Sequence, residues 1–165
     1  LKGKLKLGEV VIGNQVYELE HVFARPNEKR KRNPNDKKPY TPLLTPDSEL
    51  LSLANKITES IDKYTNGLIA TTDIYPETKQ TISAGLSVDA KAIAMEDFAV
   101  ISTCQLMGTK CLTIRCITDS PDAILHMKDP LQYHIKKKNK QNASMYLAKF
   151  FQEIMQAYDN EVSLP

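Results

Sequence analysis

The 165-residue chain has no run of about 18 apolar residues, the length at which a helix could cross a membrane. Residues 1–8 carry lysines but no apolar core, so they do not form a signal peptide. A large excess of one charge is also absent, because 22 basic residues against 20 acids give a net charge of +2. Bulk charge therefore does not indicate a polyanion binder, and we expect a soluble globular protein with no membrane partner.

Cysteine is scarce and odd in number, with Cys104, Cys111 and Cys116 as its three positions. Their spacings match no zinc-binding pattern, and all three lie in apolar, β-branched or helix-like sequence. We interpret them as buried thiols of a reducing compartment, the cytoplasm, rather than as a disulfide or a metal site.

Histidine is equally sparse, and His21, His126 and His134 share no metal-ligand spacing. We therefore expect no metal site. A surface position is the default for each, and His126 lining a pocket is the alternative.

Positive charge is concentrated in two segments, residues 25–38 and Lys136–Lys140. Prolines and few apolar residues in the first segment predict an exposed loop. Because aromatic residues are almost absent from both, we interpret them as solvated surface rather than as a nucleic-acid interface.

The N-terminal part predicts short strands at Glu9–Ile12 and Gln15–Leu19, separated by Gly13-Asn14. Thr45-Pro46-Asp47 predicts a helix start with Thr45 as the cap. Apolar residues then recur at helical spacing, and this helix is expected to stop near residues 64–67.

Gly67–Thr71 reads as a buried strand, Ile93–Met107 as a helix ended by Gly108, and Lys110–Ile117 as another buried strand. A last helix follows the second basic segment, with an apolar stripe of Leu147, Phe151, Ile154 and Tyr158 and with Phe150 beside it. This alternation predicts one α/β domain over residues 1–165, a three-layer α/β/α sandwich with a mixed, largely parallel central sheet.

Polar clusters end both central strands, at Thr71-Thr72-Asp73 and Thr118-Asp119-Ser120. Ligands of open α/β sheets bind beyond the carboxyl ends of strands, so these clusters and the Met95-Glu96-Asp97 segment can converge on one pocket. The alternative is ordinary solvation of strand ends, with Asp119 as a helix cap.

Three stretches carry a resemblance to a known family: residues 92–122, residues 67–75 and residues 5–12. Met95-Glu96 and Thr118-Asp119 are its most specific parts. The chain resembles the C-terminal half of the nucleoside phosphorylase and nucleosidase superfamily, of the purine nucleoside phosphorylase and methylthioadenosine/S-adenosylhomocysteine nucleosidase type.

The resemblance implies cleavage of the N-glycosidic bond of a purine nucleoside, by water or by phosphate. Glu96 would accept hydrogen bonds from the ribose 2′- and 3′-hydroxyls, and Met95 would pack on the sugar. Tyr75 would stack on the base. Asp119 would protonate N7 of the purine, oriented by Thr118, and must therefore carry a proton when the base leaves.

Two further residues are expected at the substrate. Asp73 follows a strand that would border the base. Arg115 lies inside an apolar strand, where an unpaired charge is costly, so we expect it to pair with a carboxylate near the site.

Ala94 departs from the family, which often has an acid two residues before the ribose-binding glutamate. The chain also starts at Leu1 without the family's N-terminal half, so we expect that a missing segment or a partner chain completes the site. The resemblance implies a homo-oligomer and no cofactor beyond phosphate as co-substrate. The alternative function is a catalytically silent nucleoside-binding, storage or interaction relative.

Overall fold

The computed structural model describes residues 5–23, 42–59, 63–73, 78–119 and 130–162. Predictions for the basic loop at residues 25–38, for Tyr75, and for Ser120 and His126 lie outside the described residues. The elements follow in chain order as β1 (Val10–Glu18), α1 (Glu20–Phe23), β2 (Leu43–Leu44), α2 (Ser48–Thr58), β3 (Tyr64–Thr71), α3 (Lys79–Ser87), β4 (Ala92–Ala94), α4 (Asp97–Met107), β5 (Ile114–Cys116) and α6 (Pro130–Val162).

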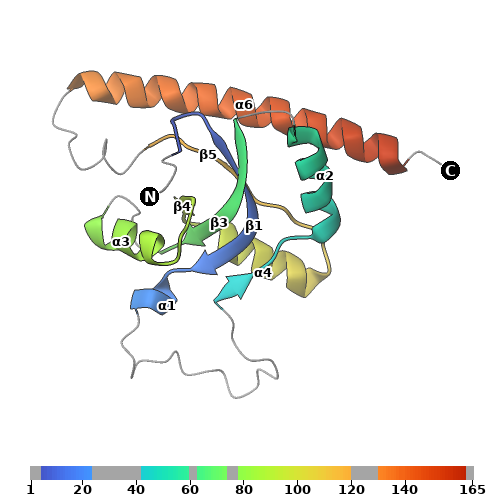
Figure 1. Cartoon of the computed structure of the whole chain (residues 1–165), viewed down its shortest axis with the longest axis horizontal. Helices are drawn as coiled ribbons and strands as arrows, with labels where there is room; N and C mark the ends of the chain where they lie inside the picture. The colour runs from blue at the N-terminus through green and yellow to red at the C-terminus, as the bar shows by residue number, and fades with distance from the viewer. Residues whose placement is uncertain (1–4, 24–41, 60–62, 74–77, 120–129, 163–165) are drawn as a thin grey trace, which may run out of the picture.

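The five described strands form one mixed sheet around β1, as Figure 1 shows. β3 runs parallel to β1 along its whole length, from the pair Val10 and Tyr64 to the pair Glu18 and Thr71, and β4 runs parallel to β3. β2 and β5 are both antiparallel to β1. The two predicted central strands therefore share a sheet, with β1 between them.

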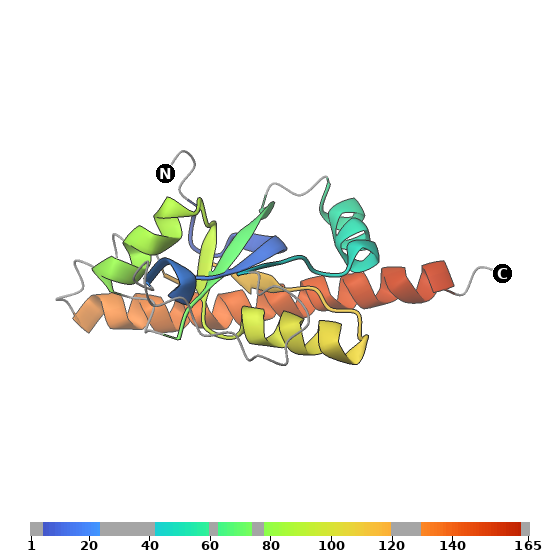
Figure 2. The same cartoon turned by 90° about the horizontal axis from the view of Figure 1, so that it is seen from below.

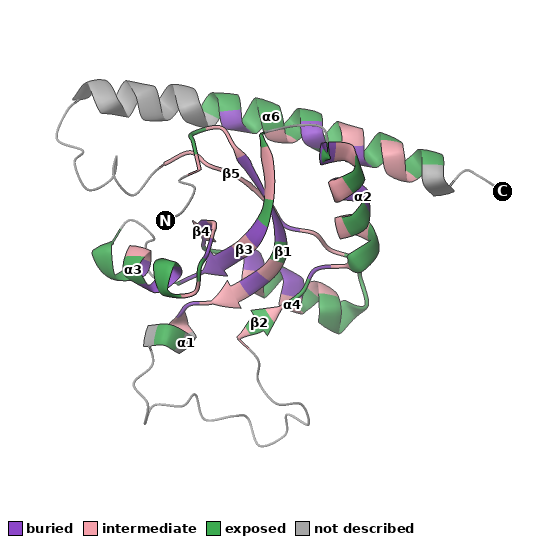
Figure 3. Cartoon of the chain, viewed as in Figure 1, coloured by how far each residue is buried: buried purple, intermediate pink, exposed green. Residues whose placement is uncertain are grey.

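Helices cover both faces of this sheet, which confirms the predicted α/β class. Val11 and Ile69 pack in one cluster with Ile101 of α4. Ile12 packs in another with Leu53 of α2 and with α6. Because successive strand residues point to opposite faces, α4 lies on one face of the sheet and α2 and α6 on the other. The buried colour in Figure 3 accordingly concentrates on the first half of β1 and the second half of β3.

β1 is one strand rather than the two predicted, because the chain continues through Gly13-Asn14 with a shift in register. A side chain at Gly13 would collide with the side chains of Thr113 and Ile69. Glycine at this position thus permits close packing and does not end the strand.

Two predicted helices begin later than expected. In α2 the cap is Asp47, whose side chain accepts from the amides of Glu49 and Leu50, so the prediction of Thr45 was wrong. The predicted helix from Ile93 divides into β4 and α4, because Ala92 and Ala94 alternate into the apolar core as strand residues do. Gly108 ends α4 in the left-handed conformation, as predicted.

α6 is 33 residues long, includes Lys136–Lys140, and extends along one side of the molecule (Figures 1 and 2). Its inner face carries Ala143, Phe150 and Ile154, whereas Phe151 is 61% exposed. The predicted apolar stripe was therefore wrong to include Phe151 and to leave Phe150 beside it, because the buried face carries Phe150.

The three cysteines are free, as expected, but only partly buried rather than buried. No helix within the described residues combines the length and apolarity needed to span a membrane.

Candidate active site

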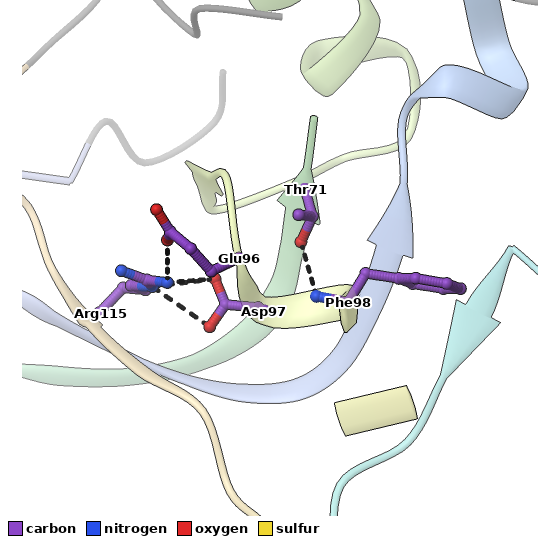
Figure 4. A network of polar contacts seen from close by, with 5 residues as sticks. All are labelled: Thr71, Glu96, Asp97, Phe98 and Arg115. Carbon is purple, nitrogen blue, oxygen red and sulfur yellow. Dashed lines mark hydrogen bonds and ion pairs between the residues drawn. The ribbon is translucent and has the colours of Figure 1, made fainter. Parts of the chain in front are cut away.

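The site begins where β4 passes into α4. Glu96 is the N-cap residue of α4, but its side chain makes no capping hydrogen bond. Instead Thr71, at the end of β3, accepts a hydrogen bond on its Oγ1 from the Phe98 amide at 3.2 Å (Figure 4). A residue of the neighbouring strand thus satisfies one of the helix's unpaired amides, and the Glu96 carboxylate is left for other partners.

Arg115 connects β5 to this helix start. Its Nε donates to Asp97 Oδ2 at 2.9 Å and Oδ1 at 3.2 Å, and its Nη2 donates to Glu96 Oε2 at 2.9 Å. Nη2 also lies 2.8 Å from Asp97 Oδ2, and Figure 4 shows both carboxylates beside one guanidinium. The expectation that Arg115 pairs with a carboxylate is therefore confirmed.

The two carboxylates have different surroundings. The Asp97 side chain is 5% exposed and that of Glu96 is 64% exposed. Burial raises the pKa of Asp97, and the hydrogen bonds from Arg115 oppose this only in part. Burial by itself would lower the pKa of Arg115, but its hydrogen bonds to Asp97 and Glu96 outweigh that effect and raise it. Arg115 therefore remains charged, with one partner in the protein interior and one facing solvent.

A second group of contacts lies at the end of β3. Glu20 Oε1 accepts a hydrogen bond from Thr72 Oγ1 at 2.8 Å and another from the Asp73 amide. The Asp73 side chain is exposed. Glu20 thus holds the backbone that leads toward residue 75, the residue predicted to stack on a base.

The predicted acid and its partner lie just after β5. Thr118 Oγ1 donates to Asp119 Oδ2 at 2.8 Å, which is the contact expected of an orienting hydroxyl. Because β5 is antiparallel to β1, and β1 is parallel to β3, the carboxyl ends of β3 and β5 point to opposite ends of the sheet. The predicted reason for convergence, two strands ending side by side, was therefore wrong.

Among the predicted site residues, Arg115 therefore contacts Glu96, and Thr118 contacts Asp119, through hydrogen bonds. Met95 lies at the junction of β4 and α4 and is 39% exposed. Sequence reasoning placed Thr71 and Asp97 in the segments expected to converge but gave neither a role, and it missed Glu20. Asp97 had a usable signal, because it adjoins Glu96 and follows an apolar segment. Thr71 and Glu20 act through contacts distant in sequence, which no local pattern reveals.

A cavity of about 730 Å³ lies elsewhere, between α2 and the start of β3. Its lining is largely polar and includes Asn55, whose Oδ1 is buried without a partner among the described residues. It contains none of the predicted site residues. No cluster of three or more potential metal ligands occurs within the described part of the chain.

The mixed sheet with its flanking helices is a fold that the chain shares with solved structures of nucleosidases. The sequence matches the phosphorylase superfamily over residues 1–156, so the chain belongs to that family. No curated protein matches it.

Three solved structures illustrate the fold. The 5′-methylthioadenosine/S-adenosylhomocysteine nucleosidase of Neisseria meningitidis, solved in complex with methylthio-immucillin-A, is 21% identical in sequence to this chain, with a TM-score of 0.70. The match covers 93% of this chain and 63% of the nucleosidase chain. The corresponding nucleosidase of Colwellia psychrerythraea, in complex with adenine, is 19% identical with a TM-score of 0.69, covering 95% and 62%.

The third, futalosine hydrolase of Helicobacter pylori, is 20% identical with a TM-score of 0.66, covering 92% of this chain and 61% of its own. The chain therefore spans 61–63% of the length of these three structures, and the likeness establishes its fold.

Proposed function

We propose that the chain carries the ribose- and base-recognising part of an enzyme that cleaves the N-glycosidic bond of purine nucleosides. One observation supports this above the others. Arg115 lies four residues before Asp119 and holds Glu96 at 2.9 Å. The segment that carries the candidate acid is thereby tied to the candidate ribose-binding glutamate, although they belong to different elements.

In this proposal Glu96 recognises the sugar. Arg115 engages Oε2, so Oε1 can accept hydrogen bonds from the 2′- and 3′-hydroxyls of a ribose. Hydrogen bonds to an ionised carboxylate are stronger than neutral ones. Met95 precedes Glu96 and is exposed beside it, where its thioether can pack on the sugar's apolar face.

Departure of the base is assigned to Asp119. As the C1′–N9 bond breaks, the electron pair goes to the purine, and the acid donates its proton to N7 so that the base leaves neutral. Water or phosphate forms the new bond to C1′ from the opposite side. Thr118 orients the acid through its 2.8 Å hydrogen bond, and Tyr75 stacks on the base with Asp73 beside it.

The test is release of free base by the purified protein together with the segment or partner chain that we expect to complete its site, because the chain alone should be nearly inactive. Adenosine, inosine, 5′-methylthioadenosine and S-adenosylhomocysteine are each incubated with and without phosphate, and free base is separated by liquid chromatography. Phosphate dependence identifies phosphorolysis. Asp119→Asn should lower turnover about 10²- to 10⁴-fold, the usual effect of losing a general acid, while nucleoside binding survives.

Asp89→Asn is the matched control, because Asp89 is an exposed carboxylate whose partner is Lys91. Undiminished turnover by the Asp119→Asn protein would refute the mechanism. Binding of nucleosides without any base release, when the completing segment or partner chain is present, would favour the alternative, a catalytically silent nucleoside-binding relative.

Glu96→Ala tests the sugar site separately. It should reduce activity on ribosides more than on 2′-deoxyribosides, because a deoxy sugar lacks one of the two hydroxyls that Glu96 would bind. An equal loss on both kinds of substrate would remove Glu96 from ribose recognition.

A further inference from the structure

The Asp97 carboxylate has no part in the chemistry proposed above, although it is the most deeply buried charged group at the site. Its side chain is 5% exposed, and it makes hydrogen bonds to Arg115 through both oxygens. We propose that Asp97 is a positioning residue, which anchors Arg115 so that the guanidinium holds Glu96 in the orientation that recognises ribose. This inference rests on the proposed function.

The geometry of the guanidinium carries the inference. Nε and Nη2 of Arg115 both contact Asp97 Oδ2, at 2.9 and 2.8 Å. Two contacts along one edge fix the plane of a rigid, planar group. Nη2 is also the atom that donates to Glu96, at 2.9 Å. The direction in which Glu96 is held therefore depends on how Asp97 anchors Arg115.

The difference in burial explains why Asp97, and not Glu96, is the anchor. Asp97 is in the first turn of α4, which Thr71 caps through the Phe98 amide. Glu96 is 64% exposed, and a long exposed side chain loses rotamer entropy when a ligand immobilises it. Holding one of its oxygens in advance removes part of that cost from ribose binding.

Ala94 fits the same arrangement. The family resemblance implies an acid at this position, but here Ala94 is 7% exposed and packs in the apolar cluster with Val11 and Ile101. A carboxylate there would be buried among apolar groups. Asp97 supplies the buried carboxylate from the other side of Glu96, so Ala94 does not argue against a working site.

The experiment compares wild-type protein with Asp97→Asn, which keeps the size of the side chain but removes its charge. We expect KM for a purine riboside to rise roughly 3- to 30-fold, within the range of couplings between contacting residues. The preference for ribosides over 2′-deoxyribosides, measured as the ratio of kcat/KM values, should fall. In a Glu96→Ala background, Asp97→Asn should leave that preference unchanged.

Arg115→Lys is the second variant, because lysine keeps the charge but cannot contact both carboxylates in a planar fork. It should reproduce the lost preference, and it keeps the inference testable if Asp97→Asn does not fold. Circular dichroism and thermal melting establish that each variant is folded.

Two outcomes would count against the inference in different ways. If Glu96→Ala changes the preference for ribosides while Asp97→Asn and Arg115→Lys leave it intact, Asp97 has only a structural role and the inference fails alone. If the wild-type protein neither binds nor cleaves purine nucleosides, the proposed function fails and this inference fails with it.

Discussion

Thr71, the last residue of β3, caps α4 from outside the helix by accepting a hydrogen bond from Phe98 N at 3.2 Å. The bond joins two segments that are 27 residues apart in the chain. The side chain of the N-cap residue usually accepts this kind of hydrogen bond, but here Thr71 accepts it in place of Glu96. The position of the helix start and the availability of the Glu96 carboxylate therefore depend on the same contact.

Thr71→Val should remove this cap while preserving the shape of the side chain. Loss of an N-cap acceptor usually costs about 0.5–2 kcal/mol, so the free energy of unfolding in urea should fall by that amount. Thr103→Val is the control, because Thr103 is exposed on the same helix and donates only to the Ala99 carbonyl. Equal stability losses in the two variants would mean that the Thr71 cap contributes nothing specific.

Phe150 and Phe151 offer an internal comparison on α6. Phe150 is fully buried and stacks on Tyr64 with ring centroids 4.8 Å apart, whereas Phe151 is 61% exposed. Phe150→Ala should lower the free energy of unfolding by about 3–5 kcal/mol. Phe151→Ala should change it by less than about 0.5 kcal/mol, as surface substitutions do. The reverse order would place the opposite face of α6 against the sheet.

The buried carboxylate predicts a pH dependence of stability. Burial raises the pKa of Asp97 above its ordinary value of 3.8. At pH values between the ordinary pKa and the raised pKa of the folded protein, Asp97 binds more protons in the folded protein than in the unfolded chain. The free energy of unfolding therefore falls as pH rises through this range. The difference in unfolding free energy between wild type and Asp97→Asn should therefore decrease from about pH 4 upwards, until Asp97 is ionised in the folded protein.

Urea unfolding of both proteins at several pH values between about 4 and 7 measures this difference, because the groups they share cancel. A difference that grows with pH would contradict the prediction. It would mean that the Arg115 ion pair outweighs burial and stabilises the charged form of Asp97.

How far the sequence predicted the site can be judged from Arg115 and Asp97. A charge inside an apolar strand must find a partner, so the need for a carboxylate beside Arg115 followed from the sequence alone. Which carboxylates serve did not, because Asp97 and Arg115 meet only when α4 packs against the sheet. The roles expected of Tyr75 and Asp119 follow from the resemblance and stay predictions.

Apolar runs and alternating residues determined the α/β class and the strand that contains Gly67–Thr71, because side-chain period is a local property of the chain. The left-handed end of α4 at Gly108 was equally local. Only the tertiary structure decided that β5 is antiparallel to β1, that Phe150 rather than Phe151 is buried, and that Thr71 caps α4. Each of these depends on which distant segments form hydrogen bonds with each other and bury each other's apolar side chains. The spacing of residues along the sequence carries no information about which distant segments come together.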